Sequence, residues 1–307
     1  MIKYNILIPI FNEEENILKI YNQIKKLDDF ISLKVTFIDD GSTDNSLKII
    51  KNISLNNKHV DFIALSKNFG HQIALSAGID NSNSEATLMM DADMQHPVKY
   101  IPEMINKFNQ KFDVVQMVKE NQGKRNLFIR ILSFLFYFLF RKFSDINISN
   151  NVSDFRLISK KVCNELKLFN EKERFIRGMV QWVGFNYAEI KYTPDERKYG
   201  KSKYNFFKLI KLASYGVFSF SSLPLKISLY FGLALSIFSF SYGVFAICKR
   251  FFFKDIVPVG YTDLIFFITF IGGIQLVFLG VLGLYILKIF EQVRGRPLYI
   301  IKDIKND

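Results

Sequence analysis

Short apolar runs alternate with amphipathic stretches over the first 120 residues of the chain. The apolar runs lie at 4–10, 34–39, 60–65, 86–90 and 112–117, and the amphipathic stretches lie at 14–28, 44–54, 70–80 and 98–109. Runs of this length, rich in Ile, Val and Phe, are typical of strands, and the stretches between them have helical spacing. The pattern therefore predicts an α/β domain with a mostly parallel sheet and helices on both faces.

Four polar loops follow the first four predicted strands. Their sequences are PIFNEEE, DDGSTD, SKNFGH and DADMQHP. Ligands of such sheets bind at the carboxyl ends of the strands, and all four loops would meet at that edge. The sequence therefore places a candidate site there.

The second loop begins with two adjacent carboxylates, Asp39 and Asp40. Gly41 and the hydroxyls after it suit a tight turn and a helix cap, which explains the loop without a ligand. Acidic residues at the end of a strand also accept hydrogen bonds from ribose or a nucleobase. We expect the second role for the two carboxylates, with capping and solvation as the alternative.

The fourth loop carries Asp91 and Asp93, which would point the same way on an extended segment. Hard oxygen ligands of this kind suit Mg²⁺ or Mn²⁺, with Gln95 as a further ligand. A D-x-D pair is common by chance, so the prediction depends on its position after a strand. We expect His96 to make a local contact rather than bind the metal.

Two long apolar segments, 227–248 and 264–287, contain no Asp, Glu, Lys or Arg. At ~1.5 Å per residue each exceeds the ~30 Å of bilayer hydrocarbon, so both are predicted to cross a membrane. Basic residues before the first and after the second place both termini in the cytoplasm. The shorter run near 127–142 contains Arg130 and predicts an interfacial helix. Buried helices of a soluble core are the alternative for all these segments.

The predicted organisation is a cytoplasmic catalytic domain followed by a membrane anchor. The expected boundaries are 1–203 for this domain, 204–224 for a juxtamembrane amphipathic helix, 225–288 for two transmembrane helices and 289–307 for a cytoplasmic tail. We expect a multi-pass protein of the inner, cytoplasmic membrane.

Charge and cysteine content narrow the class of partner. The net charge is +12, but residues 1–100 hold 10 Lys and Arg against 13 Asp and Glu. The basic residues therefore accompany the apolar segments, which favours anionic membrane lipid over nucleic acid as the partner. The two cysteines, Cys163 and Cys248, are far apart, so neither a disulfide framework nor a metal cluster is expected.

The loops and several later blocks resemble those of inverting glycosyltransferases of family 2, which have a Rossmann-like GT-A fold. The early blocks are IPIFNEEENI, FIDDGSTDNS, SKNFGHQIALSAGID and DADMQHP. The later blocks, SDFRLISKKV, RFIRGMVQWVGF, ERKYGKSKYN and GRPLYII, resemble the polyprenyl-phosphate branch, which includes dolichyl-phosphate mannose synthase and bactoprenol glucosyltransferases. The chain departs from relatives at Ser159 and Lys160, so no role is carried over to that pair.

The resemblance implies roles for particular residues. It implies that the donor nucleotide is bound by Pro9, Phe11, Asn12, Glu13, Asp39, Asp40 and Asp91; that the metal is bound by Asp91, Asp93 and Gln95; and that Asp93 and Asp154 are catalytic. The acceptor phosphate needs cations at the membrane boundary, and the candidates are Arg125, Arg130, Arg197 and Lys203. Contact with lipid head groups is the alternative for these four.

The implied reaction is inverting transfer of one sugar from a nucleotide sugar, with UDP as the expected nucleotide, to undecaprenyl phosphate for cell-envelope glycan or lipid modification. A phosphate monoester has a second pKa near ~6, so the acceptor needs little deprotonation. Asp154 is therefore either a base, an orienting group or a partner of Arg156. A processive polysaccharide synthase and a non-catalytic membrane scaffold are the alternatives. We also expect a homo-oligomer.

Overall fold

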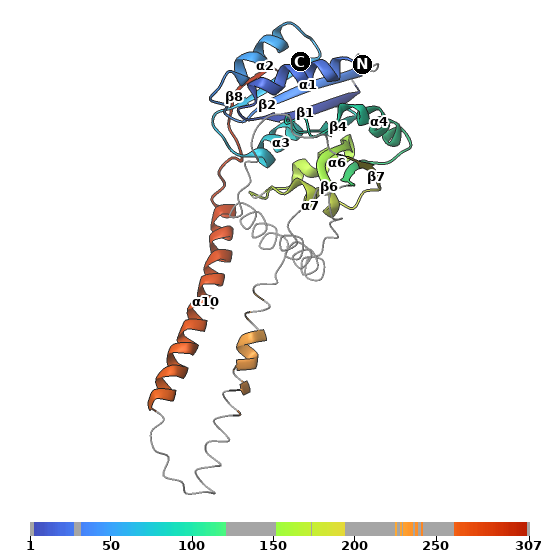
Figure 1. Ribbon diagram of the computed structural model, residues 1–307. Helices are drawn as coiled ribbons and strands as arrows, with labels where there is room; N and C mark the ends of the chain where they lie inside the picture. The colour runs from blue at the N-terminus through green and yellow to red at the C-terminus, as the bar shows by residue number, and fades with distance from the viewer. Residues whose placement is uncertain are drawn as a thin grey trace, which may run out of the picture. The chain divides into compact units, whose positions relative to one another are not determined.

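The computed structural model describes residues 3–27, 32–120, 152–172, 174–193, several positions between 225 and 241, and 261–305 (Figure 1). The chain divides into two compact units. The first comprises Met1–Arg141, Ile146–Leu209 and Arg296–Asp307, and the second comprises Lys142–Asp145 and Ile210–Gly295.

Within the described residues, the first unit is built on one eight-stranded sheet with the order β7-β5-β6-β4-β1-β2-β3-β8. The strands are β1 (Tyr4–Ile10), β2 (Leu33–Asp39), β3 (Val60–Leu65), β4 (Ala86–Met89), β5 (Val114–Lys119), β6 (Val152–Ser159), β7 (Tyr187–Tyr192) and β8 (Ile301–Lys305). β6 is antiparallel to β4 and β5, and β8 is antiparallel to β3. The other six strands run in one direction, so the expected mostly parallel sheet is confirmed.

Helices cover both faces of the sheet, because alternate side chains of the central strands are apolar on both sides. Ile6 and Ile8 of β1 belong to one core cluster, whereas Leu7 belongs to the other. The first cluster is completed by helices α1 (Glu14–Lys25), α2 (Ser46–Leu55) and α4 (Ile101–Asn109). The second is completed by α3 (His71–Asp80), α6 (Lys160–Leu168) and α7 (Ile176–Trp182).

The segment 289–307, which we expected to be a cytoplasmic tail, contains regular structure. Helix α10 (Tyr261–Val293) continues past residue 288, and Ile301–Lys305 then joins the sheet as β8. The Ser66 N–H donates to the Ile300 carbonyl at 2.9 Å, and Tyr299 Oη donates to Asp80 Oδ2 at 3.0 Å. Without this strand the backbone groups of β3 would be exposed along a sheet edge, which explains why the segment pairs there.

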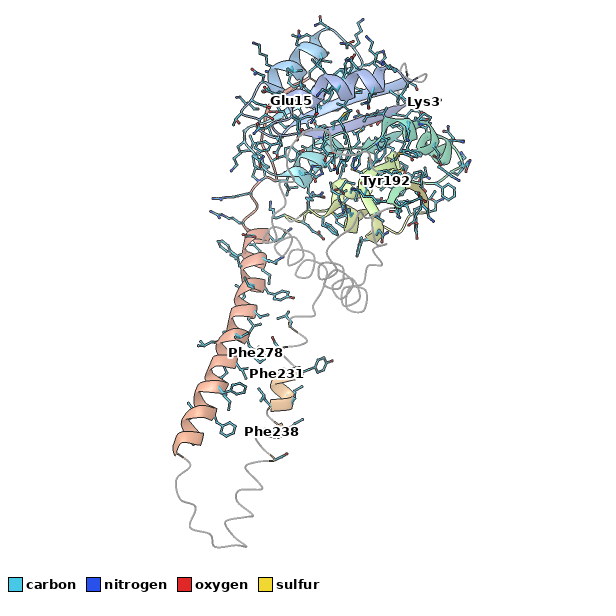
Figure 2. All side chains as sticks on the ribbon, viewed as in Figure 1. Lys3, Glu15, Tyr192, Phe231, Phe238 and Phe278 are labelled. Atoms are coloured by element: carbon cyan, nitrogen blue, oxygen red, sulfur yellow. The ribbon has the colours of Figure 1, made fainter. Side chains whose placement is uncertain are left out.

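The second unit contains α10, which includes the predicted span 264–287. Phe270–Val293 is the one helix in the described part of the chain that is long and apolar enough to cross a membrane, with a mean hydropathy of 2.2. Most of the other predicted span, 227–248, lies outside the described residues. Among its described positions, Phe231 packs edge to face on Phe278 of α10, with ring centroids 6.2 Å apart (Figure 2). The helices predicted near 127–142 and at 204–224 also lie outside the described residues.

Candidate active site

The loop after β1 is joined to the acidic turn after β2 by hydrogen bonds. The Asn12 N–H donates to Ser42 Oγ at 3.0 Å, and the Thr43 N–H donates to Asn12 Oδ1 at 2.8 Å. The Glu13 N–H donates to Ser46 Oγ at 3.0 Å. Asn12 has φ 55°, a left-handed conformation that asparagine tolerates better than most residues. Of the residues expected at the donor, Asn12 and Glu13 thus hold the two loops together.

The neighbouring positions of the first strand differ in exposure. Pro9 is buried within β1, whereas Phe11 keeps 37% of its surface exposed beside these loops. Phe11 therefore has a surface that a ligand can reach, whereas Pro9 shapes the strand beneath it.

Asp40 is buried and accepts two backbone hydrogen bonds from the loop after β3. Its carboxylate takes the Phe69 N–H at 2.7 Å and the Gly70 N–H at 2.9 Å. Burial raises the pKa of Asp40, and these two hydrogen bonds oppose that rise. Gly41 has φ +68°, and a Cβ there would lie 2.4 Å from the carbonyl carbon of Lys67. The loops after β2 and β3 therefore touch at a position where only glycine fits.

Asp39 is also buried, but only one of its two carboxylate oxygens accepts a hydrogen bond from a described residue. Its Oδ2 accepts the Ser42 N–H at 3.3 Å, whereas Oδ1 is buried and has no hydrogen-bond partner among the described residues. Burial raises the pKa of Asp39, and the hydrogen bonds from Ser42 oppose that rise. A buried acceptor without a partner costs about 1–3 kcal/mol. Asp39 Oδ1 is therefore placed to accept a hydrogen bond from a ligand hydroxyl or N–H.

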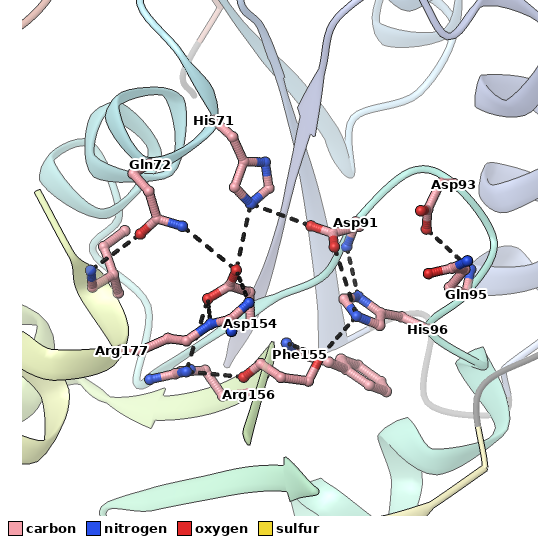
Figure 3. Close-up of polar contacts among 12 residues, drawn as sticks. His71, Gln72, Asp91, Asp93, Gln95, His96, Asp154, Phe155, Arg156 and Arg177 are labelled. Atoms are coloured by element: carbon pink, nitrogen blue, oxygen red, sulfur yellow. Dashed lines mark hydrogen bonds and ion pairs between the residues drawn. The ribbon is translucent and has the colours of Figure 1, made fainter. Parts of the chain in front are cut away.

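Asp91 and Asp93 lie in a loop, so the expected extended segment is wrong. β4 ends at Met89, and Met94 adopts φ 65° as the chain turns. Figure 3 shows Asp91 directed toward His71, with Nε2 to Oδ1 at 3.4 Å, and Asp93 directed toward Gln95, whose N–H donates to Asp93 Oδ1 at 3.1 Å. The turn rather than strand alternation therefore sets the directions of the two carboxylates, which face different neighbours.

The donor atoms of this loop fit a hard divalent cation. Asp91 Oδ1 is buried and lacks a hydrogen-bond partner within the described chain, and Asp93 and Gln95 add oxygen donors from the same loop. In the described residues no three His, Cys, Asp or Glu side chains gather as a metal site. Mg²⁺ and Mn²⁺ commonly take one or two carboxylates and complete their coordination with water and substrate phosphates.

His96 holds the backbone of the loop that carries Asp91 and Asp93. Its Nδ1 accepts the Asp91 N–H at 2.9 Å, its Nε2 lies 2.9 Å from Ser153 Oγ, and its ring stacks on Phe155 with centroids 5.0 Å apart. Because Nδ1 accepts a hydrogen bond it carries no proton, so Nε2–H is the donor to Ser153. Burial lowers the pKa of His96, which favours this neutral ring. The expectation that His96 makes a local contact is confirmed.

Asp154 on β6 forms a two-point ion pair with Arg177 on α7. Arg177 Nε donates to Oδ1 at 2.7 Å and Nη2 donates to Oδ2 at 2.7 Å (Figure 3). Burial alone would raise the pKa of Asp154, but the charge and hydrogen bonds of Arg177 lower it far below its usual range. Arg156, which we considered as the partner of Asp154, is farther away, with Nη2 at 3.9 Å from Oδ1. A carboxylate this acidic is a weak proton acceptor.

The structure adds four residues that the sequence did not single out. His71 Nε2 lies between the two carboxylates, 3.4 Å from Asp91 Oδ1 and 3.8 Å from Asp154 Oδ2. Gln72 donates to Asp154 Oδ2 at 3.4 Å and accepts the Ile176 N–H at 3.1 Å. The others are Arg177 and Lys119. Burial lowers the pKa of Lys119, and the charges of Asp91 and Asp93 oppose that effect. The sequence signals were that His71 ends the third polar loop, that Gln72 follows it, and that Arg177 is the arginine before glycine in the block RFIRGMVQWVGF.

The four cations expected at the acceptor phosphate, Arg125, Arg130, Arg197 and Lys203, lie outside the described residues.

Comparison with known proteins fixes the family. The family model for glycosyl transferase family 2 matches residues 5–167, which includes all four polar loops, β6 and Asp154. The chain belongs to glycosyl transferase family 2. It is a glycosyltransferase with a mixed α/β GT-A fold and a mostly parallel sheet.

Two relatives of this family 2 member match over nearly their whole length. An uncharacterized glycosyltransferase of Bacillus subtilis, YkcC, is 38% identical over 98% of this chain and 94% of its own. The bactoprenol glucosyl transferase of Shigella phage SfII is 37% identical over 98% of this chain and 97% of its own. Among solved structures, residues 1–349 of Staphylococcus aureus TarS are 15% identical, over 71% of this chain and 66% of that chain, with a TM-score of 0.48.

Proposed function

We propose that the protein transfers a single sugar, with inversion, from a nucleotide sugar to a polyprenyl phosphate in the cytoplasmic membrane. The observation that carries this proposal is the end-to-end similarity to proteins named bactoprenol glucosyl transferase, which covers 98% of this chain and 97% of one such relative. A glycosyltransferase site and an apolar helix in one chain support a lipid acceptor. Undecaprenyl phosphate is the proposed acceptor, and a product used in cell-envelope glycan or lipid modification is the proposed outcome.

On the donor side, the loops after β1 and β2 would hold the nucleoside. We assign the ligand hydrogen bond to Asp39, whose Oδ1 has no partner in the described part of the protein. Asp40 instead fixes the loop through Phe69 and Gly70. UDP is the proposed nucleotide, and Phe11 offers an exposed ring beside these loops.

Asp91, Asp93 and Gln95 would hold Mg²⁺ or Mn²⁺ at the donor diphosphate. A bound divalent ion supplies Lewis-acid stabilisation of the charge that grows on the departing diphosphate. Asp93 is catalytic in this sense, because it would hold that ion at the reacting end of the donor. His96 fixes the backbone on which these ligands are presented.

On the acceptor side, the nucleophile is an oxygen of a phosphate that is already ionised, because its second pKa is near ~6. One displacement at the anomeric carbon then inverts its configuration, and no strong base is needed. The ion pair between Asp154 and Arg177 supports this view, since it leaves Asp154 a weak base. Arg125, Arg130, Arg197 and Lys203 are proposed to guide the lipid phosphate at the membrane boundary.

A radiolabel assay tests the function. Membranes containing the protein receive polyprenyl phosphate and labelled UDP-glucose, UDP-N-acetylglucosamine or GDP-mannose in turn. We expect label in the organic phase, released by mild acid, with at least one donor, and none with Asp93→Asn. Label in insoluble polymer would indicate a processive synthase. No label in either fraction with any donor would refute the proposal.

We propose that both termini and the first unit face the cytoplasm, with two transmembrane helices, and that the protein forms a homo-oligomer. Reporter fusions at each terminus and in the loop near residue 255 test the topology. An external terminus would contradict it. Mass measurement of the detergent-solubilised protein tests the oligomer, and a monomer would contradict that part.

A further inference from the structure

Among the residues that the structure describes, the site contains several acidic groups and few cations that a ligand can reach. Asp39 ends β2, Asp91 and Asp93 lie in the loop after β4, and Asp154 lies near the start of the antiparallel strand β6. All four carboxylates are therefore at the carboxyl edge of the sheet or beside it. Arg156 is fully buried, and its Nη2 donates to the Ser153 carbonyl at 2.9 Å. An anionic acceptor would be repelled by these carboxylates unless another cation faced it.

Arg177 combines a fixed position with a partly exposed side chain. Two of its nitrogens are fixed on Asp154, yet 38% of its side chain is exposed, whereas the Asp154 side chain is 9% exposed. One edge of the guanidinium therefore faces the buried carboxylate, while the side chain as a whole stays partly exposed. A planar guanidinium held in this way suits two-point binding of a phosphate.

The residues around this ion pair hold it in one place. Gln72 at the start of α3 bonds Asp154 with its side-chain nitrogen and the Ile176 N–H with its side-chain oxygen. Ile176 directly precedes Arg177, so α3, β6 and the start of α7 are joined at the ion pair. Such a clamp fixes the guanidinium before a ligand arrives, which reduces the entropy lost on binding.

Lys119 is a second cation of this region. It ends β5 and pairs with Tyr192 in the register of β5 and β7. Its pKa is lowered first by burial and then by the charge of Arg177, while Asp91 and Asp93 raise it. Val118, next to Lys119, lies opposite Val152 at the start of β6, and Tyr192 Oη donates to Ser153 Oγ at 3.1 Å, so β5 ends beside the strand that carries Asp154. Together Lys119 and Arg177 can balance two negative charges.

We propose that Arg177 and Lys119 form the subsite for the phosphate of the lipid acceptor, and that Asp154 is the positioning residue that holds Arg177. This inference rests on the proposed function and deepens it. One acceptor phosphate oxygen forms the bond to the anomeric carbon, while the bond from that carbon to the donor diphosphate breaks. The bonding electrons leave with the diphosphate, and no proton transfer is required.

The first test separates acceptor binding from donor binding. The probes are a short-chain polyprenyl monophosphate and the corresponding alcohol, measured as substrate and competitor with the full-length protein in detergent. We expect Arg177→Gln to raise the acceptor KM by about 10- to 100-fold, the range for a lost charge-assisted hydrogen bond. Arg177→Lys keeps the charge and should recover part of the loss, and Lys119→Gln should also raise the acceptor KM. The donor KM should stay within about twofold of the wild-type value in all three.

Lys191→Gln is the matched control, because it removes one exposed positive charge from β7. It should change neither KM. An Arg177→Gln variant that leaves the acceptor KM unchanged, or raises both KM values equally, would overturn the subsite. An unchanged donor KM also shows that the variant is folded.

The second test uses Asp154. In Arg177→Gln the buried carboxylate of Asp154 has lost its ion pair with Arg177 and repels an anionic acceptor. Adding Asp154→Asn to this variant should therefore recover part of the acceptor affinity. Asp154→Asn alone should raise the acceptor KM, since Arg177 loses its anchor. If Asp154 were a base instead, Asp154→Asn would lower kcat with an unchanged acceptor KM, and the double variant would be worse than either.

The wild-type protein distinguishes failure of this inference from failure of the proposed function. If the wild type transfers sugar to the phosphate probe and Arg177→Gln leaves the acceptor KM unchanged, the proposed subsite is wrong and the proposed function still holds. Absence of transfer to any polyprenyl phosphate by the wild type would overturn both.

Discussion

His96 is predicted to hold the loop that carries the proposed metal ligands, and His96→Phe tests this directly. The substitution keeps a flat ring for the stack on Phe155 but removes both ring nitrogens. The Asp91 N–H then loses its acceptor at 2.9 Å, and Ser153 Oγ loses its partner at 2.9 Å. Ser153 keeps the hydroxyl of Tyr192 at 3.1 Å, so the larger cost falls on Asp91.

The size of the effect follows from these contacts. A buried donor left without a partner costs about 1–3 kcal/mol, and an ordinary lost hydrogen bond costs about 0.5–1.5 kcal/mol. We therefore expect His96→Phe to lower the free energy of unfolding by about 2–4 kcal/mol. For a unit of this size that corresponds to a fall in Tm of about 5–15 °C.

Thermal unfolding of the detergent-solubilised protein gives the stability, and sugar transfer against metal concentration gives the function. The displaced Asp91 backbone should lower kcat, because a shift of about 1 Å in a catalytic group can cost about 100-fold. Tyr192→Phe is the control and should lose about 1 kcal/mol. Wild-type Tm and wild-type transfer in His96→Phe would refute the reasoning. Weaker metal binding with an unchanged Tm would instead make His96 a ligand.

Three further predictions concern the carboxylates. Asp93→Asn should abolish transfer in a folded, membrane-bound protein, and transfer by the wild type in the presence of a chelator would contradict the role assigned to the metal. Asp39→Asn should raise the donor KM, whereas Asp40→Asn should mainly lower Tm, because it weakens two backbone hydrogen bonds; kinetics and melting of both variants check this, and the reverse pattern would contradict it. The pKa of Asp154 is lower in the folded protein, so its stabilisation is present above the unfolded pKa of about 3.9 and is lost as pH falls below that value. The Tm difference between wild type and Asp154→Asn should therefore narrow below about pH 4, and a constant difference would count against the ion pair.

The sequence was sufficient to predict the strands that alternate with helices along the chain. Ile6, Leu7 and Ile8 alternate between the two core clusters, and this is the local pattern on which the prediction depended. β6 escaped the pattern because Asp154 and Arg156 interrupt it with buried charges. Its antiparallel place between β4 and β5 depends on pairing between distant segments, which no local period reports.

For the candidate site too, the sequence predicted what depends on local pattern and missed what depends on contacts between distant segments. The loops were placed at the correct edge, but adjacent Asp39 and Asp40 could not be told apart. Their difference depends on the Phe69 and Gly70 N–H groups, which lie about 30 residues further along the chain. Likewise, Arg177 meets Asp154 only because α7 packs against α3 and β6, so the pair is a product of tertiary structure.

The eighth strand gives the protein an order of assembly. β8 lies next to β3 in the sheet, yet it follows α10 in the chain. During synthesis the edge of β3 that pairs with β8 therefore stays unpaired until α10 and the residues after it have left the ribosome. Under the proposed topology, completion of the sheet in the first unit is coupled to insertion of that helix into the membrane.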